Sequence, residues 1–111
     1  MEEKEVIKNF IEATVRNGEA LSQGNSSLAN IEFDKIKIIY NELKNNNKLD
    51  LLSSLLNYSN NNVRLKVATY LLPIKTEEAK QVLSELCTKT GIIKIFAKAT
   101  LKEWERGNLK L

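Results

Sequence analysis

Two charged side chains lie at positions where the hydrophobic pattern predicts burial, Glu32 and Arg64. At helical spacing, Glu32 falls on the same apolar face as Ile39, and Arg64 falls on the same apolar face as Leu71. A buried charge without a partner is strongly destabilising, so each of these residues needs a partner or a route to water. We expect Glu32 and Arg64 to pair with each other or with nearby backbone groups and to lock their helices together. The alternative is a partly buried charged pocket for a ligand.

The residue types that most enzymes need are missing from the chain. It contains no histidine, which excludes histidine-based triads, acid/base catalysis by histidine and histidine metal ligands. Its four glycines are scattered and begin no phosphate-binding loop or dinucleotide fingerprint. Three pairs of neighbouring carboxylates lie on a predicted surface or terminus, where helix-end charge and solubility explain them: Glu2 and Glu3, Glu77 and Glu78, and Glu103 and Glu105. We expect a protein that is not an enzyme, with no catalytic residues, metal site, cofactor or small-molecule substrate.

The single cysteine, Cys87, excludes an internal disulfide and any site built from several cysteines. It lies beside an apolar helix face, so we interpret it as a small buried residue rather than a reactive thiol. The amino terminus is acidic where a secretory signal is basic, and no apolar run approaches the roughly 20 residues of a membrane span. These features predict a cytoplasmic protein that does not insert into a membrane.

Length and composition predict one all-α domain over residues 1–111. A chain of 111 residues can bury enough apolar surface to fold without metal or disulfide. One proline and four glycines are few for the many turns of an all-β chain. The charge is uneven, because residues 1–56 carry seven basic and nine acidic side chains, a formal charge of −2, whereas residues 57–111 carry ten and five, a charge of +5. This polarity can steer an anionic partner to the carboxy-terminal half.

Hydrophobic spacing and turn residues predict about six helices. They cover residues 3–22, 27–45, 49–58, 60–73, a segment that Thr76 caps, and 91–106. The helix at 60–73 has asparagines for a cap, Pro73 as a stop, and apolar residues around most of its circumference. Only Lys66 and Thr69 form an obvious solvent strip. We therefore expect this helix to be the centre of the fold.

Two predicted helices carry surface features beyond their core faces. On the helix at 27–45, Ile31 and Ile38 form a second apolar stripe, in addition to a main face that includes Leu28 and Phe33. On the last helix, basic residues recur at four-residue intervals, forming a basic ridge of Lys94, Lys98, Lys102 and Arg106. The simplest interpretation of the basic ridge is a solvated helix face. The alternative is a site for an anion or a partner.

The central helix resembles the second helix of a HEAT-type repeat. The run Asn62-Val63-Arg64, followed by Val67-Ala68 and Leu71-Leu72, carries the resemblance. Residues 60–62 are asparagines where many such repeats have Asp and Pro, so a partner for Arg64 must come from elsewhere. The resemblance implies antiparallel helical hairpins in a right-handed superhelical bundle.

From about residue 6 to 109, the chain resembles a small bacterial family of uncharacterised helical domains with a HEAT-like core. The resemblance rests on residues 18–21, 63–65, 68–73, 78–79, 82–83 and 97–104. Small domains of this kind often resemble immunity proteins, which block polymorphic or contact-dependent growth inhibition toxins in the cytoplasm. That functional step is an analogy, because fold alone does not fix function.

The leading hypothesis is an immunity protein that covers the active site of a cognate toxin domain, for example a nuclease. The residues expected to bind the toxin are Ile31, Glu32, Asp34, Ile38 and Glu42. Their carboxylates would suit a basic nuclease cleft, whereas the basic ridge would suit an acidic toxin surface. One alternative is nucleic-acid binding through the basic ridge. Another is a scaffold or adaptor, which only the identity of the partner would distinguish from an immunity protein.

Overall fold

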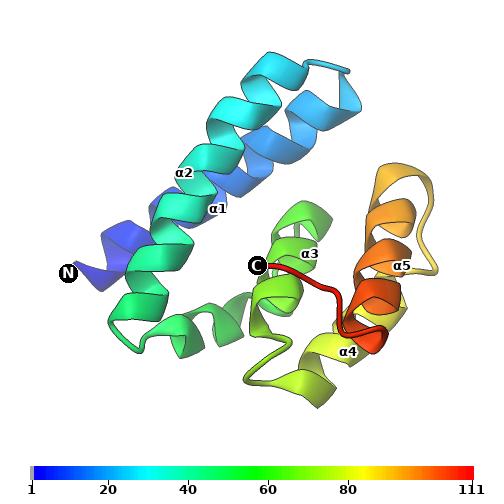
Figure 1. The fold of residues 1–111 in the computed structure, drawn as a ribbon. Coiled ribbons are helices and arrows are strands. Elements are labelled where there is room, and N and C mark those ends of the chain that lie inside the picture. Colours follow the sequence, from blue (N-terminus) through cyan, green and yellow to red (C-terminus); the bar gives the residue numbers. More distant parts are fainter. Residues whose placement is uncertain (1) are drawn as a thin grey trace. The chain divides into compact units, whose positions relative to one another are not determined.

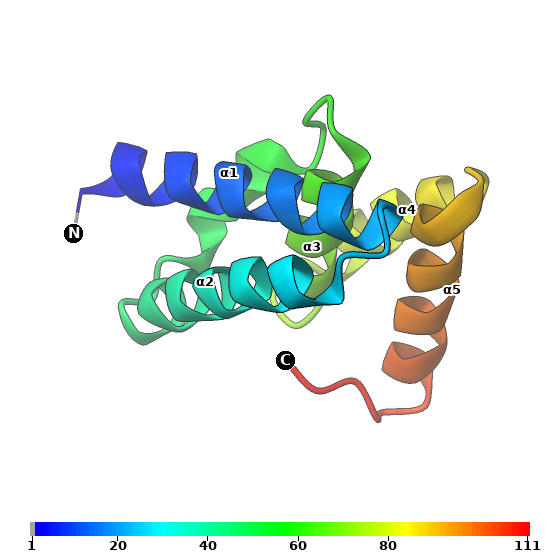
Figure 2. The same cartoon turned by 90° about the horizontal axis from the view of Figure 1, so that it is seen from above.

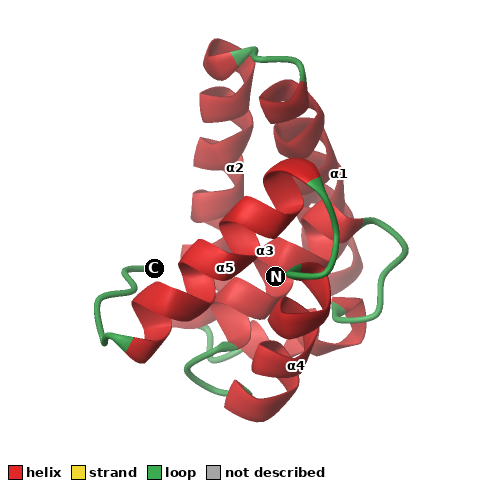
Figure 3. Ribbon diagram, turned by 90° about the vertical axis from the view of Figure 1, so that its right-hand side faces the viewer, coloured by secondary structure: helices red, strands yellow, loops and turns green. Residues whose placement is uncertain are grey.

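The computed structural model describes residues 2–111, and in that range it contains five α-helices, one 3-10 helix and no strand (Figures 1 and 3). The helices are α1 (Glu3–Ser22), α2 (Ser26–Asn45), η1 (Leu49–Leu55), α3 (Asn61–Leu71), α4 (Thr76–Leu86) and α5 (Gly91–Glu105). The predicted all-α fold is confirmed. The predicted bounds agree with α1, α2 and α5 to within one residue at each end.

The chain forms two compact units, one ending at Leu52 and the other spanning Ser53–Leu111. The first unit contains α1 and α2, and the second contains α3, α4 and α5. The 3-10 helix η1 crosses the boundary between them. We expected a single domain with superhelical stacking over the whole chain. Both expectations concern how the two units combine, so they stay predictions.

In the first unit, α1 and α2 pack side by side as an antiparallel hairpin (Figures 1 and 2). Gly24 allows the tight turn between them because its φ of 71° lies in the left-handed region. The Asn25 side chain then caps α2 by accepting a hydrogen bond from the backbone N of Leu28 at 3.1 Å.

The hairpin buries a mixed apolar and polar interface. Its buried apolar residues are Phe10, Ala13, Ala20, Ala29, Ile36, Tyr40 and Leu43. Asn17 is also buried, and its Nδ2 donates to the backbone oxygen of Ala29 at 2.8 Å, which ties α1 directly to α2. Gly18 is buried in the interior of α1 and does not end the helix.

In the second unit, α3 packs against both α4 and α5. The Asn60 side chain caps α3 by accepting from the backbone N of Asn62 at 2.8 Å and of Val63 at 3.2 Å. The α-helix ends at Leu71, two residues before Pro73, which cannot continue it. Six of its eleven residues are buried, a larger share than in any other helix of residues 2–111. The central role predicted for this helix is therefore confirmed within its own unit.

Two local predictions in this part of the chain were wrong. The helix expected over residues 49–58 is the shorter 3-10 helix η1, which ends at Leu55. Thr76 is the first residue of α4 rather than its cap, because its hydroxyl donates backward to the oxygen of Leu72 at 2.7 Å. Lys75 occupies the cap position without a side-chain cap bond. The turn after Pro73 determines this outcome, since the backbone N of Lys75 already bonds to the oxygen of Leu71 at 2.7 Å.

Candidate functional site

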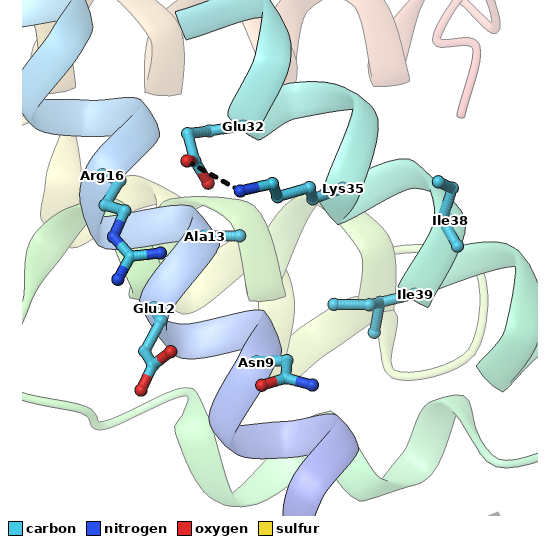
Figure 4. Close-up of a pocket in the computed structure, with 8 residues that line it drawn as sticks. All are labelled: Asn9, Glu12, Ala13, Arg16, Glu32, Lys35, Ile38 and Ile39. Atoms are coloured by element: carbon cyan, nitrogen blue, oxygen red, sulfur yellow. Dashed lines mark hydrogen bonds and ion pairs between the residues drawn. The ribbon is translucent and has the colours of Figure 1, made fainter. Parts of the chain in front are cut away.

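A hollow of about 280 Å³ lies between the two helices of the first unit (Figure 4). It is lined by Asn9, Glu12, Ala13 and Arg16 from α1 and by Glu32, Lys35, Ile38 and Ile39 from α2. The lining mixes two carboxylates, two cations, one amide and three apolar side chains. Such a mixture can bind a group that has both a charged end and an apolar stem.

The Glu32 carboxylate is the most unusual group in this hollow. The residue is only 3% exposed, and its Oε1 accepts from the Lys35 ammonium at 3.2 Å (Figure 4). Its Oε2 is buried and has no hydrogen-bond partner within residues 2–111. A buried acceptor without a donor costs stability, and more so when it belongs to a charged group. The carboxylate is therefore only half satisfied.

The register of α2 explains why Glu32 is buried. It lies on the same side of the helix as Ile36 and Leu43, both of which are fully buried. Lys35 lies three residues further on, close enough for its flexible side chain to reach Glu32. The Lys35 side chain remains 52% exposed, so water screens this ion pair from its outer side.

Next to the hollow, α2 presents the predicted stripe to solvent. Ile31 is 55% exposed, and Ile38, which also lines the hollow, is 67% exposed. Asp34 and Glu42 are exposed and fall on the same side of the helix at helical spacing. We call these four residues the isoleucine stripe. Exposed apolar side chains bordered by charge are typical of protein-binding surfaces.

The structure therefore separates the five residues predicted to bind a toxin. Four of them form the exposed isoleucine stripe, whereas Glu32 lies buried at the inner side of α2. Leu28 and Phe33, expected on the main apolar face, are each more than a third exposed. The buried face of α2 is thus narrower than the sequence predicted.

Sequence reasoning missed the part of the hollow that α1 contributes. Asn9, Glu12 and Arg16 follow one another at spacings of three and four residues, so a polar stripe on one face of α1 was visible in the sequence. Nothing in that spacing indicated which stripe of α1 borders Glu32. That relation depends on how α1 and α2 pack.

Arg64 has its own partners within the second unit. Its Nη2 lies 2.6 Å from Oε2 of Glu85 on α4, and its Nε donates to the backbone oxygen of Leu56 at 3.0 Å. The predicted pairing of Arg64 with Glu32 was wrong, because each residue pairs within its own unit. The predicted backbone contact of Arg64 is confirmed. This arginine clamps α3 to α4 and to the segment that precedes α3.

The basic ridge is a true surface feature of α5. All four of its residues, Lys94, Lys98, Lys102 and Arg106, are exposed. Arg106 lies 3.8 Å from Glu103, whereas none of the three lysines has an ion pair within residues 2–111. Ile95, which lies next to them, is 64% exposed. Only Ala97 is fully buried in this helix.

Residues 2–111 contain neither a membrane-spanning helix nor a cluster of metal-ligating side chains. None of the helices there is long and apolar enough to cross a membrane. No group of three or more cysteine and carboxylate side chains in that range is placed to hold a metal ion. Cys87 is a free thiol and is half-buried, rather than fully buried as expected.

Comparison with known proteins gives a family and a fold. The model of the DUF2019 family, described as a domain of unknown function, matches residues 4–103. The chain is also similar to the crystal structure of the protein RPA1889 from Rhodopseudomonas palustris CGA009. The identity is 26% and the TM-score 0.90, over 100% of this chain and 94% of the other. Among curated proteins, no significant match was found.

Proposed function

We propose that this chain, which belongs to the DUF2019 family, binds a protein partner through the isoleucine stripe and acts as an immunity protein against a toxin domain. The exposure of Ile31 and Ile38 beside a hollow is the observation that carries this proposal. The hollow combines charged and apolar walls, a lining that suits recognition of a partner's side chain.

The isoleucine stripe has the features of a small binding surface. Burial of the isoleucine side chains against a partner would favour a complex by about 25 cal/mol per Å² of apolar area, before the cost of association is subtracted. The hollow beside Ile38 offers a place for a side chain of the partner, and energetically dominant contacts concentrate in such recesses.

The charges next to the isoleucines favour a basic partner. Asp34 and Glu42 lie on the isoleucine stripe, where they can attract a positively charged surface over some distance. Enzymes that cleave nucleic acids need basic clefts to hold phosphates. A nuclease toxin domain, with this stripe covering its cleft, therefore fits the charge of the surface.

The test is co-purification with the product of the neighbouring gene, combined with rescue of cells that express that product. Ile38→Ser should weaken capture and rescue, whereas Ile95→Ser should leave both unchanged. The two isoleucines make a matched pair, because they are 67% and 64% exposed on different helices. Failure of the wild-type chain to rescue would reject the immunity function. Capture of a partner that is not a toxin would instead favour a scaffold or adaptor.

A second candidate function is nucleic-acid binding by the basic ridge. The exposure of its four cations, three of them without an ion pair in the described part of the chain, supports this alternative. Each phosphate neutralised on a duplex should contribute about 0.9 to the slope of log affinity against log salt. Replacing the three lysines by glutamine should then abolish retention on a random duplex at low salt. No retention of the wild type would remove this alternative.

A further inference from the structure

We propose that the hollow beside Glu32 receives an arginine side chain of the partner protein, and that Lys35 holds the place of its guanidinium in the free protein. This inference rests on the proposed protein-binding function and names the chemistry that the partner must present.

The first reason is the unsatisfied oxygen of Glu32. Glu32 is the only carboxylate among the buried residues of the described chain, and its Oε2 has no donor there. A guanidinium can donate two parallel N–H bonds to both oxygens of one carboxylate, whereas an ammonium acts as a point charge. Lys35 reaches only Oε1. An entering arginine can therefore donate to the Glu32 oxygen that Lys35 leaves without a donor.

The second reason is the size and the walls of the hollow. Its volume of about 280 Å³ far exceeds the roughly 30 Å³ that one water molecule occupies in the liquid. Ala13, Ile38 and Ile39 give it apolar walls that suit the methylene stem of an arginine. A hollow this large therefore has room for a side chain as well as for a bridging water.

The third reason is the weak hold of the resident cation. The Lys35 side chain is half exposed and contacts Glu32 through a single bond of 3.2 Å. Lys35 can swing outward into water when a guanidinium enters, because the entering cation then compensates the buried carboxylate in its place. Arg16, the other cation of the lining, is exposed and can do the same. Glu12 and Asn9 then remain as further acceptors for the entering group.

A small probe tests this inference without any partner. The ¹⁵N-labelled protein is titrated with n-butylguanidinium chloride, and sodium chloride and n-butylammonium chloride serve as references. We expect saturable shifts of the backbone amides around Glu32 and Lys35, with the guanidinium binding more tightly than the ammonium. Absence of saturable shifts would overturn the inference. Equal binding of the two organic cations would also overturn the assignment to arginine.

Variants make the test specific to the buried carboxylate. Glu32→Gln should weaken the guanidinium about tenfold, because it removes a charge-assisted hydrogen bond. Asp34→Asn, which removes an exposed carboxylate two residues away, should leave the affinity unchanged. Lys35→Met should strengthen binding, because it removes the competing cation. Its effect keeps the test decisive even if Glu32→Gln does not fold. Unchanged affinity in Lys35→Met, or in a folded Glu32→Gln variant, would contradict the proposal.

The inference and the proposed function can fail separately. A partner that binds Glu32→Gln as tightly as wild type would overturn the arginine site and leave the protein-binding function intact. Saturable binding of inorganic phosphate at the same amides, with Arg16 and Lys35 as its ligands, would also overturn it. If instead the probe binds as expected but the protein rescues no cells from a toxin, the arginine site is supported and the immunity function is rejected.

Discussion

Glu32 and Arg64 are both charged residues on faces that the hydrophobic pattern marks as apolar, yet the two units treat them differently. Arg64 has a carboxylate at 2.6 Å and a backbone oxygen at 3.0 Å, so its Nη2 and its Nε both have partners. One oxygen of Glu32 accepts a hydrogen bond from the half-exposed Lys35, and the other has no hydrogen-bond partner within residues 2–111. A largely buried charge with two partners holds helices together, whereas a buried carboxylate with one unpaired oxygen lowers stability and leaves bonding capacity for a ligand.

The largest expected change in stability follows from removing Arg64, the charged residue whose partners are in place. Arg64→Ala should lower the free energy of unfolding by about 2 kcal/mol, because it breaks an ion pair and leaves the Leu56 oxygen without its donor. Urea unfolding followed by circular dichroism measures this change. The Gln81→Ala variant, at an exposed position of α4, is the control and should change stability little. An Arg64→Ala protein as stable as wild type would show that Arg64 is not a clamp.

A somewhat smaller loss is expected for the satisfied polar group of the first unit. Asn17→Ala should cost about 1 to 1.5 kcal/mol, because the Ala29 oxygen then loses a buried donor. Thr14→Val is the matched variant on the same helix, since the buried Thr14 hydroxyl has no partner within residues 2–111. It should be neutral or slightly stabilising in the same urea experiment. Equal losses in both variants would mean that packing, not hydrogen bonding, dominates here.

Replacing Glu32, whose carboxylate lacks one hydrogen bond, should raise stability rather than lower it. Glu32→Met should raise the free energy of unfolding by about 1 kcal/mol, because an apolar side chain replaces a buried carboxylate that lacks one hydrogen bond. Glu42→Met, on the exposed side of the same helix, is the control and should have almost no effect on stability. Strong destabilisation by Glu32→Met would place Glu32 with Arg64 as a structural residue and would end the contrast between them.

The smallest expected effect concerns the exposed isoleucines. Ile38→Ser and Ile95→Ser should each change the free energy of unfolding by less than about 0.5 kcal/mol, since both side chains are mostly in water. Thermal unfolding of the two variants beside wild type checks this. If Ile38→Ser proved clearly destabilising, its effect on partner capture would no longer report on binding alone.

The fold could be predicted from the sequence wherever local chemistry decides it. The caps at Asn25 and Asn60, the left-handed turn at Gly24 and the stop at Pro73 each depend on one residue and its immediate neighbours. Gly107 ends the last helix in the same way, with a φ of 74°. Such signals depend little on tertiary context. They explain why the bounds of the long helices were predicted closely.

The candidate site was harder to predict because it depends on packing between helices. Glu85 lies 21 positions after Arg64, and only the contact of α3 with α4 brings the two together. The hollow likewise needs the stagger of α1 against α2, which the spacing of Asn9 and Arg16 alone does not determine. The exposed isoleucines were found because a stripe at seven-residue spacing requires no knowledge of the neighbouring helix.

The bond from Asn17 to Ala29 fixes how far α1 is shifted along α2. A methyl group packs almost as well after a helix slides by one turn, but an amide and a carbonyl meet at only one stagger. Asn17 therefore works as an alignment pin, which fixes the height of α1 along α2. Because Glu12 and Arg16 are on the same helix, the pin also fixes the height at which they face Glu32. Without this bond, α1 could shift along α2 and misalign the two walls of the hollow, although both helices would remain folded.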